Sequence, residues 1–374
     1  MKREFINIKN SFNGYLMSGD SKVLKVKNNI IIKLMNKNKL PLHFRFREKI
    51  IDTSIENWLH TRYIDTSRRN FDKISKVLGL SSNDLDNIIN FKAFSITDNY
   101  WLKKDEEDVS YEELIELSKG NYISDVALNG DDIKFQQINI TPELTNIGSF
   151  EKCWHYENEV WYLKKKGDIM GCGSNISEVI AYEIAKLVGI KCARYEIVEG
   201  GRYVICESIA KTSNLEPWGT ISEELDDDYI LEFLSDVDKE KYLDMIYLDA
   251  LIRNIDRHEF NFALETNRNT GEFLGLSKIY DNNLSLVGVE QVSGIKTGLA
   301  VTKMNAKILK VYGVKYKKVD IKSLENIIKE ICNSLSVEEQ YKLEDKLMLD
   351  KFDLESYILT QVIKSDEALR KILG

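Results

Sequence analysis

The chain has 374 residues, of which 43% are hydrophobic and 30% are charged. This is the composition of a globular protein, and it excludes a chain that is disordered throughout. The 52 Lys and Arg residues against 60 Asp and Glu give a formal net charge of −8. An acidic balance argues against a general nucleic-acid binder, because such proteins usually carry a basic excess. The length predicts two or three domains, or one large unit with two lobes.

Cysteine and histidine spacing argues against structural metal sites. The five cysteines form no CxxC pair, and the four histidines form no HExxH motif, so neither a zinc site nor a disulfide framework is expected. The N-terminal MKREFINIKN lacks the apolar core of a signal peptide. No apolar run approaches the roughly 20 residues of a membrane helix. We therefore expect a cytoplasmic protein that does not enter a membrane.

The first third of the chain predicts short strands followed by helices. Residues 1–40 alternate between apolar and polar, with turns expected at Asn13-Gly14 and Asn28-Asn29. Residues 54–120 show helical spacing, and Ser82-Asn83-Asp84 is an N-cap cluster before Leu85. The segment 94–101 that follows is dense in aromatic residues.

The middle of the chain predicts strands around one clear helix. A strand over Val160–Leu163 follows a turn at Glu157-Asn158, and strands are expected at 193–198 and 203–207. Apolar residues share one face over 176–188, which predicts a helix that Gly189 ends. We place a boundary near 215–219, so that residues 1–212 form an N-terminal lobe and residues 213–374 a C-terminal lobe.

From residue 222 the chain is mostly helical. A helix over 238–252 is expected to end at Asn254 in the left-handed conformation. Residues 259–281 are the exception, because Asn269-Thr-Gly271 predicts the turn of a hairpin there. A mixed α/β first half thus precedes a largely helical second half, which is an α+β organisation.

The most specific motif is a set of oxygen-bearing side chains around that hairpin. Asp256 follows the helix, Asn261 comes five residues later, and Asp281 ends the second strand. Protein kinases place a catalytic Asp, a metal-binding Asn five residues on, and a second metal-binding Asp after a short hairpin. In this chain Arg257-His258 follow the first Asp, whereas the usual His-Arg pair precedes it. The alternative is that Asp256 only caps a turn and Asn261 only satisfies backbone groups.

A lysine run supplies candidate phosphate ligands. Leu163 and Lys165 share one face of the strand, so Lys165 would face a nucleotide if Leu163 does. A shift of one residue would put Lys164 there, and three solvated lysines are the alternative to both. Glu178 on the next helix could hold the lysine, with Glu183 as a second candidate. Alternatively, Asn175 and Glu178 form a capping box that starts the helix.

Further candidates are glycine loops and a strand-end carboxylate. Gly148 and Ser149 lie in a loop before the lysine strand, where backbone N–H groups could bind phosphate. A second cluster, Gly171-Cys-Gly173, has the character of a tight turn before a helix. Glu207 closes a strand where a kinase offers its adenine contacts, or else it is a solvated side chain.

The order of these segments resembles the HipA-like serine/threonine kinases, the persistence-toxin kinase family, in the form common in Firmicutes. The resemblance rests on six segments spread over most of the chain, namely 94–103, 144–154, 161–165, 178–190, 254–262 and 279–285. It implies an α+β, two-lobed, protein-kinase-like fold with ATP and Mg²⁺ as cosubstrate and metal. One departure is Ile255, since related sequences often read Asn-Thr-Asp there; Ile255 lies off the reacting atoms.

The resemblance also implies roles for single residues. Asp256 would be the catalytic base, and Asn261 and Asp281 would be metal ligands. Lys165 would bind phosphate and Glu178 would orient it. The 145–152 loop would cover the nucleotide, with Ser149, or Thr145 behind it, as an autophosphorylation site.

The sequence thus predicts a kinase that transfers the γ-phosphate of ATP to a Ser or Thr hydroxyl of a protein. An antitoxin-like partner is expected, and direct nucleic-acid binding is not, because no helix-turn-helix is evident. The alternatives are a pseudokinase-like regulatory module and a kinase for a small-molecule or lipid hydroxyl.

Overall fold

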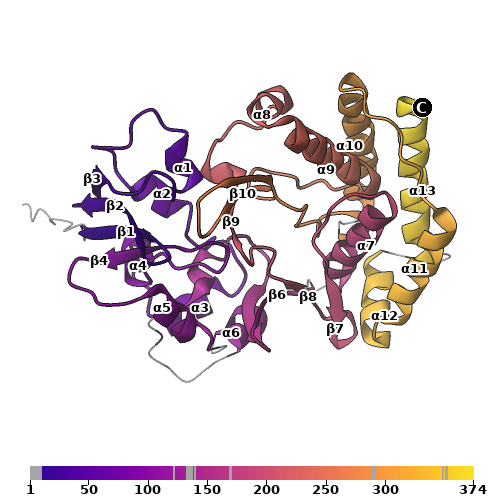
Figure 1. Ribbon diagram of the computed structural model, residues 1–374. Coiled ribbons are helices and arrows are strands. Elements are labelled where there is room, and N and C mark those ends of the chain that lie inside the picture. Colours follow the sequence, from indigo (N-terminus) through magenta and orange to yellow (C-terminus); the bar gives the residue numbers. More distant parts are fainter. Residues whose placement is uncertain are drawn as a thin grey trace, which may run out of the picture.

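The computed structural model describes residues 11–120, 123–131, 138, 140–167, 171–288, 291–347, 349 and 353–374. Within the described residues, three antiparallel sheets occupy the N-terminal and central parts of the chain. Long helices form the C-terminal part, which lies beside the sheets (Figure 1). The functional candidates fall where these two parts meet.

The first sheet contains the strands nearest the N-terminus. Its order is β3-β2-β1-β4, formed by β1 (Gly14–Ser18), β2 (Ser21–Lys27), β3 (Ile30–Leu34) and β4 (Tyr100–Lys104). The predicted turn at Asn28-Asn29 is confirmed, since both residues have positive φ. The turn predicted at Asn13-Gly14 is wrong, because Gly14 begins β1. A Cβ at Gly14 would lie 2.1 Å from the Lys103 carbonyl oxygen, so the glycine permits close strand pairing.

In the described ranges, four short helices lie between β3 and β4, and two more follow β4. They are α1 (Leu42–Arg45), α2 (Glu56–His60), α3 (Phe71–Leu78), α4 (Asp84–Asn90), α5 (Tyr111–Ser118) and α6 (Ser124–Asn129). The predicted cap is confirmed, because the Asn83 side chain accepts hydrogen bonds from the Leu85 and Asp86 N–H groups. Helical spacing over 54–120 did not predict β4, which joins the first sheet through long-range pairing with β1.

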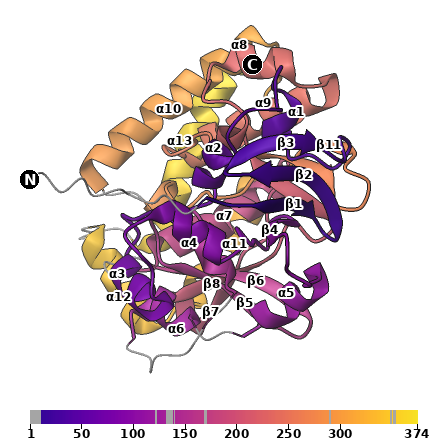
Figure 2. The ribbon, with the colours of Figure 1, turned by 90° about the vertical axis from the view of Figure 1, so that its left-hand side faces the viewer.

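The second sheet carries the lysine strand. Its order is β5-β6-β8-β7, formed by β5 (Lys152–Glu157), β6 (Val160–Lys166), β7 (Glu196–Val198) and β8 (Tyr203–Glu207). The β5–β6 turn lies at Asn158 and Glu159, one residue later than predicted. In this hairpin Lys152 lies opposite Lys165. Figure 2 shows the first and second sheets one above the other.

Helix α7 (Gly173–Leu187) connects the second sheet to the C-terminal helices. It ends before Gly189, which has the positive φ predicted for a helix stop. Its buried residues, such as Ile176, Ile180 and Ile184, share one hydrophobic core with the helices that follow. Figure 1 shows α7 between the second sheet and these helices. Side chains on α7 are therefore fixed relative to both parts of the molecule.

The third sheet brings distant segments together. Its order is β11-β10-β9, formed by β9 (Ser213–Pro217), β10 (Ala263–Asn267) and β11 (Phe273–Leu276). The predicted hairpin is confirmed, with Gly271 at positive φ in its turn. The Leu215 N–H donates to the Thr97 carbonyl at 2.8 Å, which ties this sheet to the segment before β4.

The C-terminal helices form the largest core. They are α8 (Asp227–Phe233), α9 (Asp236–Ile252), α10 (Gln291–Val311), α11 (Ile321–Asn333), α12 (Val337–Lys346) and α13 (Leu354–Leu373). Helix α9 packs against α10 and α13. It ends at Ile252, as predicted, but the left-handed residue is Arg253 and not Asn254; the Asn254 amide donates to Asp249 Oδ1 at 2.9 Å.

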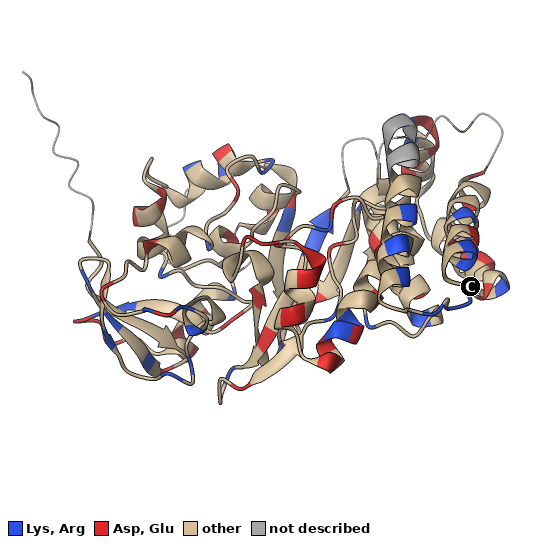
Figure 3. Ribbon diagram, turned by 90° about the horizontal axis from the view of Figure 1, so that it is seen from above, with Lys and Arg blue, Asp and Glu red and all other residues tan. Residues whose placement is uncertain are grey.

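Acidic and basic side chains are interspersed over both the strand-rich and the helical parts (Figure 3). The described cysteines, Cys153, Cys172, Cys192, Cys206 and Cys332, are buried as free thiols. Among the described helices, we find none with the length and apolar character needed to cross a membrane.

Candidate active site

One cavity lies between the second sheet, the loop after α9 and the segment after β11. Of the residues singled out from the sequence, it is lined by Gly148, Ser149, Lys165, Glu207, Asp256, Asn261 and Asp281. These residues span more than 130 positions of the sequence. The fold therefore brings residues from five segments to one cavity: the loop before β5, strand β6, the end of β8, the loop after α9 and the segment after β11.

Lys165 is a buried cation that lines the cavity. Its Nζ lies 2.6 Å from Glu178 Oε1 and 2.7 Å from Asp281 Oδ1. Burial alone would lower the pKa of this ammonium, but the Asp281 and Glu178 carboxylates hold it well above its usual value. Lys165 is therefore charged at neutral pH.

Lys164 points away from the cavity. Its Nζ lies 3.0 Å from Glu199 Oε1 and 4.1 Å from the centre of the Tyr203 ring. The two-residue period of β6 separates Lys164 and Lys165 onto opposite faces of the sheet. Of the two lysines left open by the sequence, Lys165 is the one that reaches the cavity.

Glu178 is fully buried on α7 and links two elements. Its Oε1 accepts from Lys165, and its Oε2 accepts from the Asn282 N–H at 2.8 Å. The capping-box alternative is wrong, because α7 begins at Gly173 and the Asn175 amide donates to the Gly201 carbonyl at 2.9 Å. The second candidate, Glu183, pairs with Lys186 at 3.6 Å and does not contact Lys165.

Asp256 and Asn261 lie together in the loop after α9. The Asn261 amide nitrogen donates to the Asp256 carbonyl at 2.7 Å, and the Asp256 N–H donates to Asn254 Oδ1 at 3.1 Å. Burial raises the pKa of the Asp256 carboxyl above its ordinary value. The Asn261 side-chain oxygen is not used in this bond and remains available to a cation.

Arg257 is a functional residue that the sequence reasoning missed, because its place after Asp256 was taken only as a departure from the kinase order. Its guanidinium donates two hydrogen bonds to the Asp249 carboxylate, at 3.0 and 2.9 Å. It also donates to the Asn261 and Tyr280 carbonyls, at 2.5 and 2.7 Å. One buried side chain thus joins α9, the loop and the segment before Asp281. The available signal was Asp249, an acidic residue on the buried face of α9, which needs a cationic partner.

Asp281 has a strongly stabilised negative charge. Its backbone has a φ of 57°, which is uncommon for a residue other than glycine and aims its side chain at Lys165. Burial would raise the pKa of this carboxyl, but the Lys165 and Lys152 ammonium groups hold it well below its usual range. Asp281 is therefore an ionised oxygen ligand.

Lys152 is a second cation that the sequence reasoning did not select. It lines the cavity beside Lys165, which is its cross-strand partner in the β5–β6 hairpin. Burial lowers the pKa of its ammonium to about 8, while Asp281 acts in the opposite direction. Within the described part of the chain, no hydrogen bond or ion pair uses its Nζ. The signal was its position across the β5–β6 hairpin, which a two-residue register would have placed beside Lys165.

The glycine loop approaches these lysines closely. Gly148 has a φ of 118°, and a Cβ there would lie 2.5 Å from Lys152 Nζ. Ser149 is exposed at the edge of the cavity, while the Thr145 hydroxyl donates inward to the Phe94 carbonyl at 2.9 Å. Gly173 of the second cluster instead packs against Val287, where a Cβ would lie 2.2 Å from the carbonyl oxygen.

Glu207 ends β8 at the far wall of the cavity. It lines the cavity together with Ser208, and its carboxylate forms an ion pair with Lys211.

Comparison with known proteins gives similarity at the level of structure only. No protein-family model matches the sequence, and no curated protein matches it either. HipA from the Shewanella oneidensis MR-1 toxin–antitoxin system, solved with HipB and its operator DNA, has a TM-score of 0.52 and 13% identity. The match covers 97% of this chain and 98% of that one.

A second similar structure is the proinflammatory kinase CtkA of Helicobacter pylori. It has 16% identity and a TM-score of 0.38, over 59% of this chain and 93% of that one. At 13% identity, the similarity to HipA establishes the fold alone. The resemblance seen in the sequence is confirmed at that level: the chain has the α+β, two-lobed, protein-kinase-like fold of HipA.

Proposed function

We propose that the protein is a kinase that transfers the γ-phosphoryl group of ATP to a Ser or Thr hydroxyl of a protein. The observation that carries this proposal is the position of Lys165 between Glu178 and Asp281, in the same cavity as Asp256 and Asn261. Lobes 1–212 and 213–374 would enclose the nucleotide between them.

The charged groups fit ATP and Mg²⁺. Lys165 and Lys152 would bind phosphate oxygens, and Glu178 would hold Lys165 in place. Asp281 and the free oxygen of Asn261 would hold Mg²⁺, which takes most of its other ligands from phosphates and water. The described residues contain no cluster of three or more His, Cys, Asp or Glu side chains suited to a metal.

The chemistry assigned to the chain is positioning and charge stabilisation. Asp256 would accept the proton of the acceptor hydroxyl as its oxygen attacks the γ-phosphorus and ADP leaves. Mg²⁺, when bound, would neutralise charge that develops on the phosphate oxygens. Arg257 would act as a positioning residue, because it holds the loop of Asp256 and Asn261 against the segment of Asp281.

Three further assignments follow from the same arrangement. Gly148 and Ser149 would cover the phosphates, and the end of β8 at Glu207 would face the adenine. Ser149 is exposed and is our first candidate for autophosphorylation, with Thr145 behind it. The HipA neighbour was solved with HipB, and an antitoxin-like partner is proposed here by analogy with that complex.

Two other functions use the same fold. A pseudokinase-like regulatory module would need no catalytic base, so the joint presence of Lys165, Asp256, Asn261 and Asp281 favours an active enzyme. A kinase for a small-molecule or lipid hydroxyl would use the same site. The lipid alternative is weakened by the acidic net charge and the absence of a basic amphipathic helix from the sequence.

The test is intact-mass analysis after incubation with Mg-ATP, with Asp256→Asn treated in parallel. The proposal predicts a gain of about 80 Da per phosphate on the wild-type protein only, with fragments mapping it to Ser149. If neither protein gains mass, autophosphorylation is wrong. Calorimetry with Mg-ATP then separates a kinase restricted to its substrate, which binds ATP, from a module without a nucleotide site.

A further inference from the structure

The cavity continues past Asp256 into a region of which the proposed function uses only Thr145. We call this region the threonine side; it is lined by Trp58, Thr61, Arg62, Thr97, Asp98, Thr145, Glu216 and Thr220. We call the part around Lys152, Lys165, Glu178 and Asp281 the lysine side. Asp256, His258 and Phe260 line the same cavity, so the threonine side is continuous with the proposed catalytic base.

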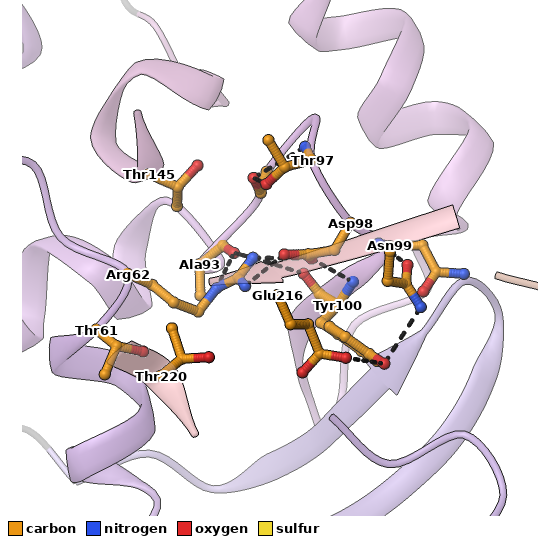
Figure 4. A network of polar contacts seen from close by, with 12 residues as sticks. Thr61, Arg62, Ala93, Thr97, Asp98, Asn99, Tyr100, Thr145, Glu216 and Thr220 are labelled. Carbon is orange, nitrogen blue, oxygen red and sulfur yellow. Dashed lines mark hydrogen bonds and ion pairs between the residues drawn. The ribbon is translucent and has the colours of Figure 1, made fainter. Parts of the chain in front are cut away.

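A buried ion pair makes the threonine side rigid. The Arg62 guanidinium contacts the Asp98 carboxylate in two places, at 2.6 and 3.0 Å. Its Nε and Nη2 also donate to the Ala93 carbonyl, at 3.2 and 2.9 Å, and its guanidinium lies 4.7 Å from the centre of the Trp58 ring. Figure 4 shows this pair with Thr61, Thr97, Thr145 and Thr220 around it. Arg62 and Asp98 neutralise each other and leave little charge for a ligand.

The threonine hydroxyls present hydrogen-bond acceptors. Thr61 donates its hydroxyl hydrogen to the Trp58 carbonyl at 2.7 Å, and Thr220 donates to the Pro217 carbonyl at 2.7 Å. Thr145 likewise donates to the Phe94 carbonyl. A hydroxyl has only one hydrogen to donate, so each of these oxygens has only lone pairs left for a ligand.

Glu216 adds a buried carboxylate without a cation. Its Oε2 accepts from the Leu42 N–H at 2.6 Å and its Oε1 from the Tyr100 hydroxyl at 3.3 Å, but it forms no ion pair with any described residue. Burial raises the pKa of this carboxyl to about 8; the Leu42 N–H opposes this effect, Asp98 adds to it, and Arg45 and the Tyr100 hydroxyl also oppose it. Without a ligand this carboxyl is therefore largely protonated at pH 7, and a cation that approaches through the cavity lined by Glu216 would favour its ionised form.

These features together point to the group that fits. The walls offer lone pairs and one carboxylate, so a complementary group is positively charged and rich in N–H donors. We propose that the threonine side is the acceptor subsite, and that Glu216, Thr61 and Thr220 bind the Lys or Arg side chain of a protein segment whose Ser or Thr lies at Asp256. This inference rests on the proposed kinase function and specifies its substrate.

The test is phosphate transfer from γ-labelled ATP to a set of synthetic peptides. Each peptide has one Ser and one Arg at a varied distance from it, and each has a matched peptide with neutral citrulline in place of Arg. We expect wild-type protein to prefer Arg over citrulline in at least one register by about ten-fold or more in kcat/KM. That preference corresponds to the loss of one charge-assisted contact.

Variants then test which residues are responsible for the preference for Arg over citrulline peptides. In Glu216→Gln the advantage of Arg over citrulline should fall about ten-fold, while kcat/KM for the citrulline peptide and the affinity for Mg-ATP stay unchanged. Thr220→Val should reduce the same advantage, and it provides a second variant if Glu216→Gln does not fold. Glu223→Gln is the matched control, because it removes one exposed carboxylate three residues from Thr220, outside the cavity; it should keep the full preference.

The outcomes separate the two proposals. If wild-type protein binds Mg-ATP but phosphorylates Arg and citrulline peptides equally, or neither, the acceptor subsite is wrong and the nucleotide site stands. A preference for Arg that survives in both Glu216→Gln and Thr220→Val also overturns the inference. Failure of the wild-type protein to bind Mg-ATP would overturn the proposed function, and the inference with it.

Discussion

On the lysine side of the cavity, Lys165 lies between two carboxylates, whereas on the threonine side Glu216 has only a backbone N–H and a tyrosine hydroxyl. Residues of both sides line the same cavity, but their buried charged groups differ in whether they have an oppositely charged partner. A buried ion pair that loses one partner leaves an uncompensated charge, whereas the Glu216 carboxyl, with a pKa of about 8, is largely neutral at pH 7 until a cation approaches it. The comparison teaches that the lysine side is held together before any ligand binds, and that the threonine side is completed by a cation.

The largest expected effect breaks the lysine side. Lys165→Met should lower the free energy of unfolding by about 3–5 kcal/mol, because Glu178 and Asp281 would remain buried without their cation. It should also abolish measurable Mg-ATP binding. Lys164→Met is the matched control on the same strand; its side chain faces away from the cavity, so chemical denaturation should show a change within about 0.5 kcal/mol.

The next effect separates charge from geometry on the lysine side. Arg257→Lys keeps the positive charge but loses the two-point contact with Asp249 and at least one carbonyl contact. We expect a loss of about 2 kcal/mol in stability and a lower kcat, with the KM for ATP changed much less. A variant that kept wild-type kcat would show that Arg257 does not position the loop of Asp256.

A rise in pH should weaken Mg-ATP binding on the lysine side and strengthen the preference for Arg peptides on the threonine side. Lys152 has a pKa of about 8, so it loses its positive charge as the pH rises from 7 to 9, and Mg-ATP affinity should fall by about five-fold. Asp281, Lys165, Arg68 and Glu143 also act on this group. Calorimetry across this range should show the fall in wild-type protein and a flat profile in Lys152→Met.

On the threonine side the sign is reversed. Glu216 also has a pKa of about 8, but it gains its negative charge as the pH rises, so the preference for Arg peptides should increase between pH 7 and 9. Tyr100, Asp98 and Arg45 are the ionisable groups that act on Glu216. Peptide kinetics at both pH values measure this, and a preference that weakened with rising pH would contradict the assignment.

The smallest effect concerns stability on the threonine side. Glu216→Gln removes a carboxylate that has no cation, and the Gln oxygen can still accept from the Leu42 N–H. We expect stability at pH 9 to be unchanged or higher by at most about 1 kcal/mol. A large loss, similar to that of Lys165→Met, would mean that Glu216 is paired and would remove the difference between the two sides.

Much of the lysine side could be predicted because its residues follow local patterns. The Asp256 to Asn261 interval, the strand of Lys165 and the helix of Glu178 each lie within short segments whose periodicity indicates their structure. The residues that were missed, Lys152 and Arg257, depend on contacts across a hairpin and between separated elements. Periodicity does not determine such contacts.

The threonine side could not be predicted from local patterns at all. Its residues come from α2, the segment before β4, the glycine loop and β9, and long-range pairing brings these together. Glu216 is within a strand where alternation alone gives no reason for a buried carboxylate. The strand at Gly14 shows the same limit on a smaller scale, since close pairing with the distant Lys103 backbone places this glycine in β1.

The central claim is that Asp256 is the base of a phosphoryl-transfer site, and the most direct measurement compares transfer with binding in one variant. Asp256→Asn keeps the size of the side chain but cannot accept a proton. We predict that it binds Mg-ATP as tightly as the wild-type protein, yet transfers labelled γ-phosphate at least about 100-fold more slowly. Transfer by Asp256→Asn at the wild-type rate would contradict the account.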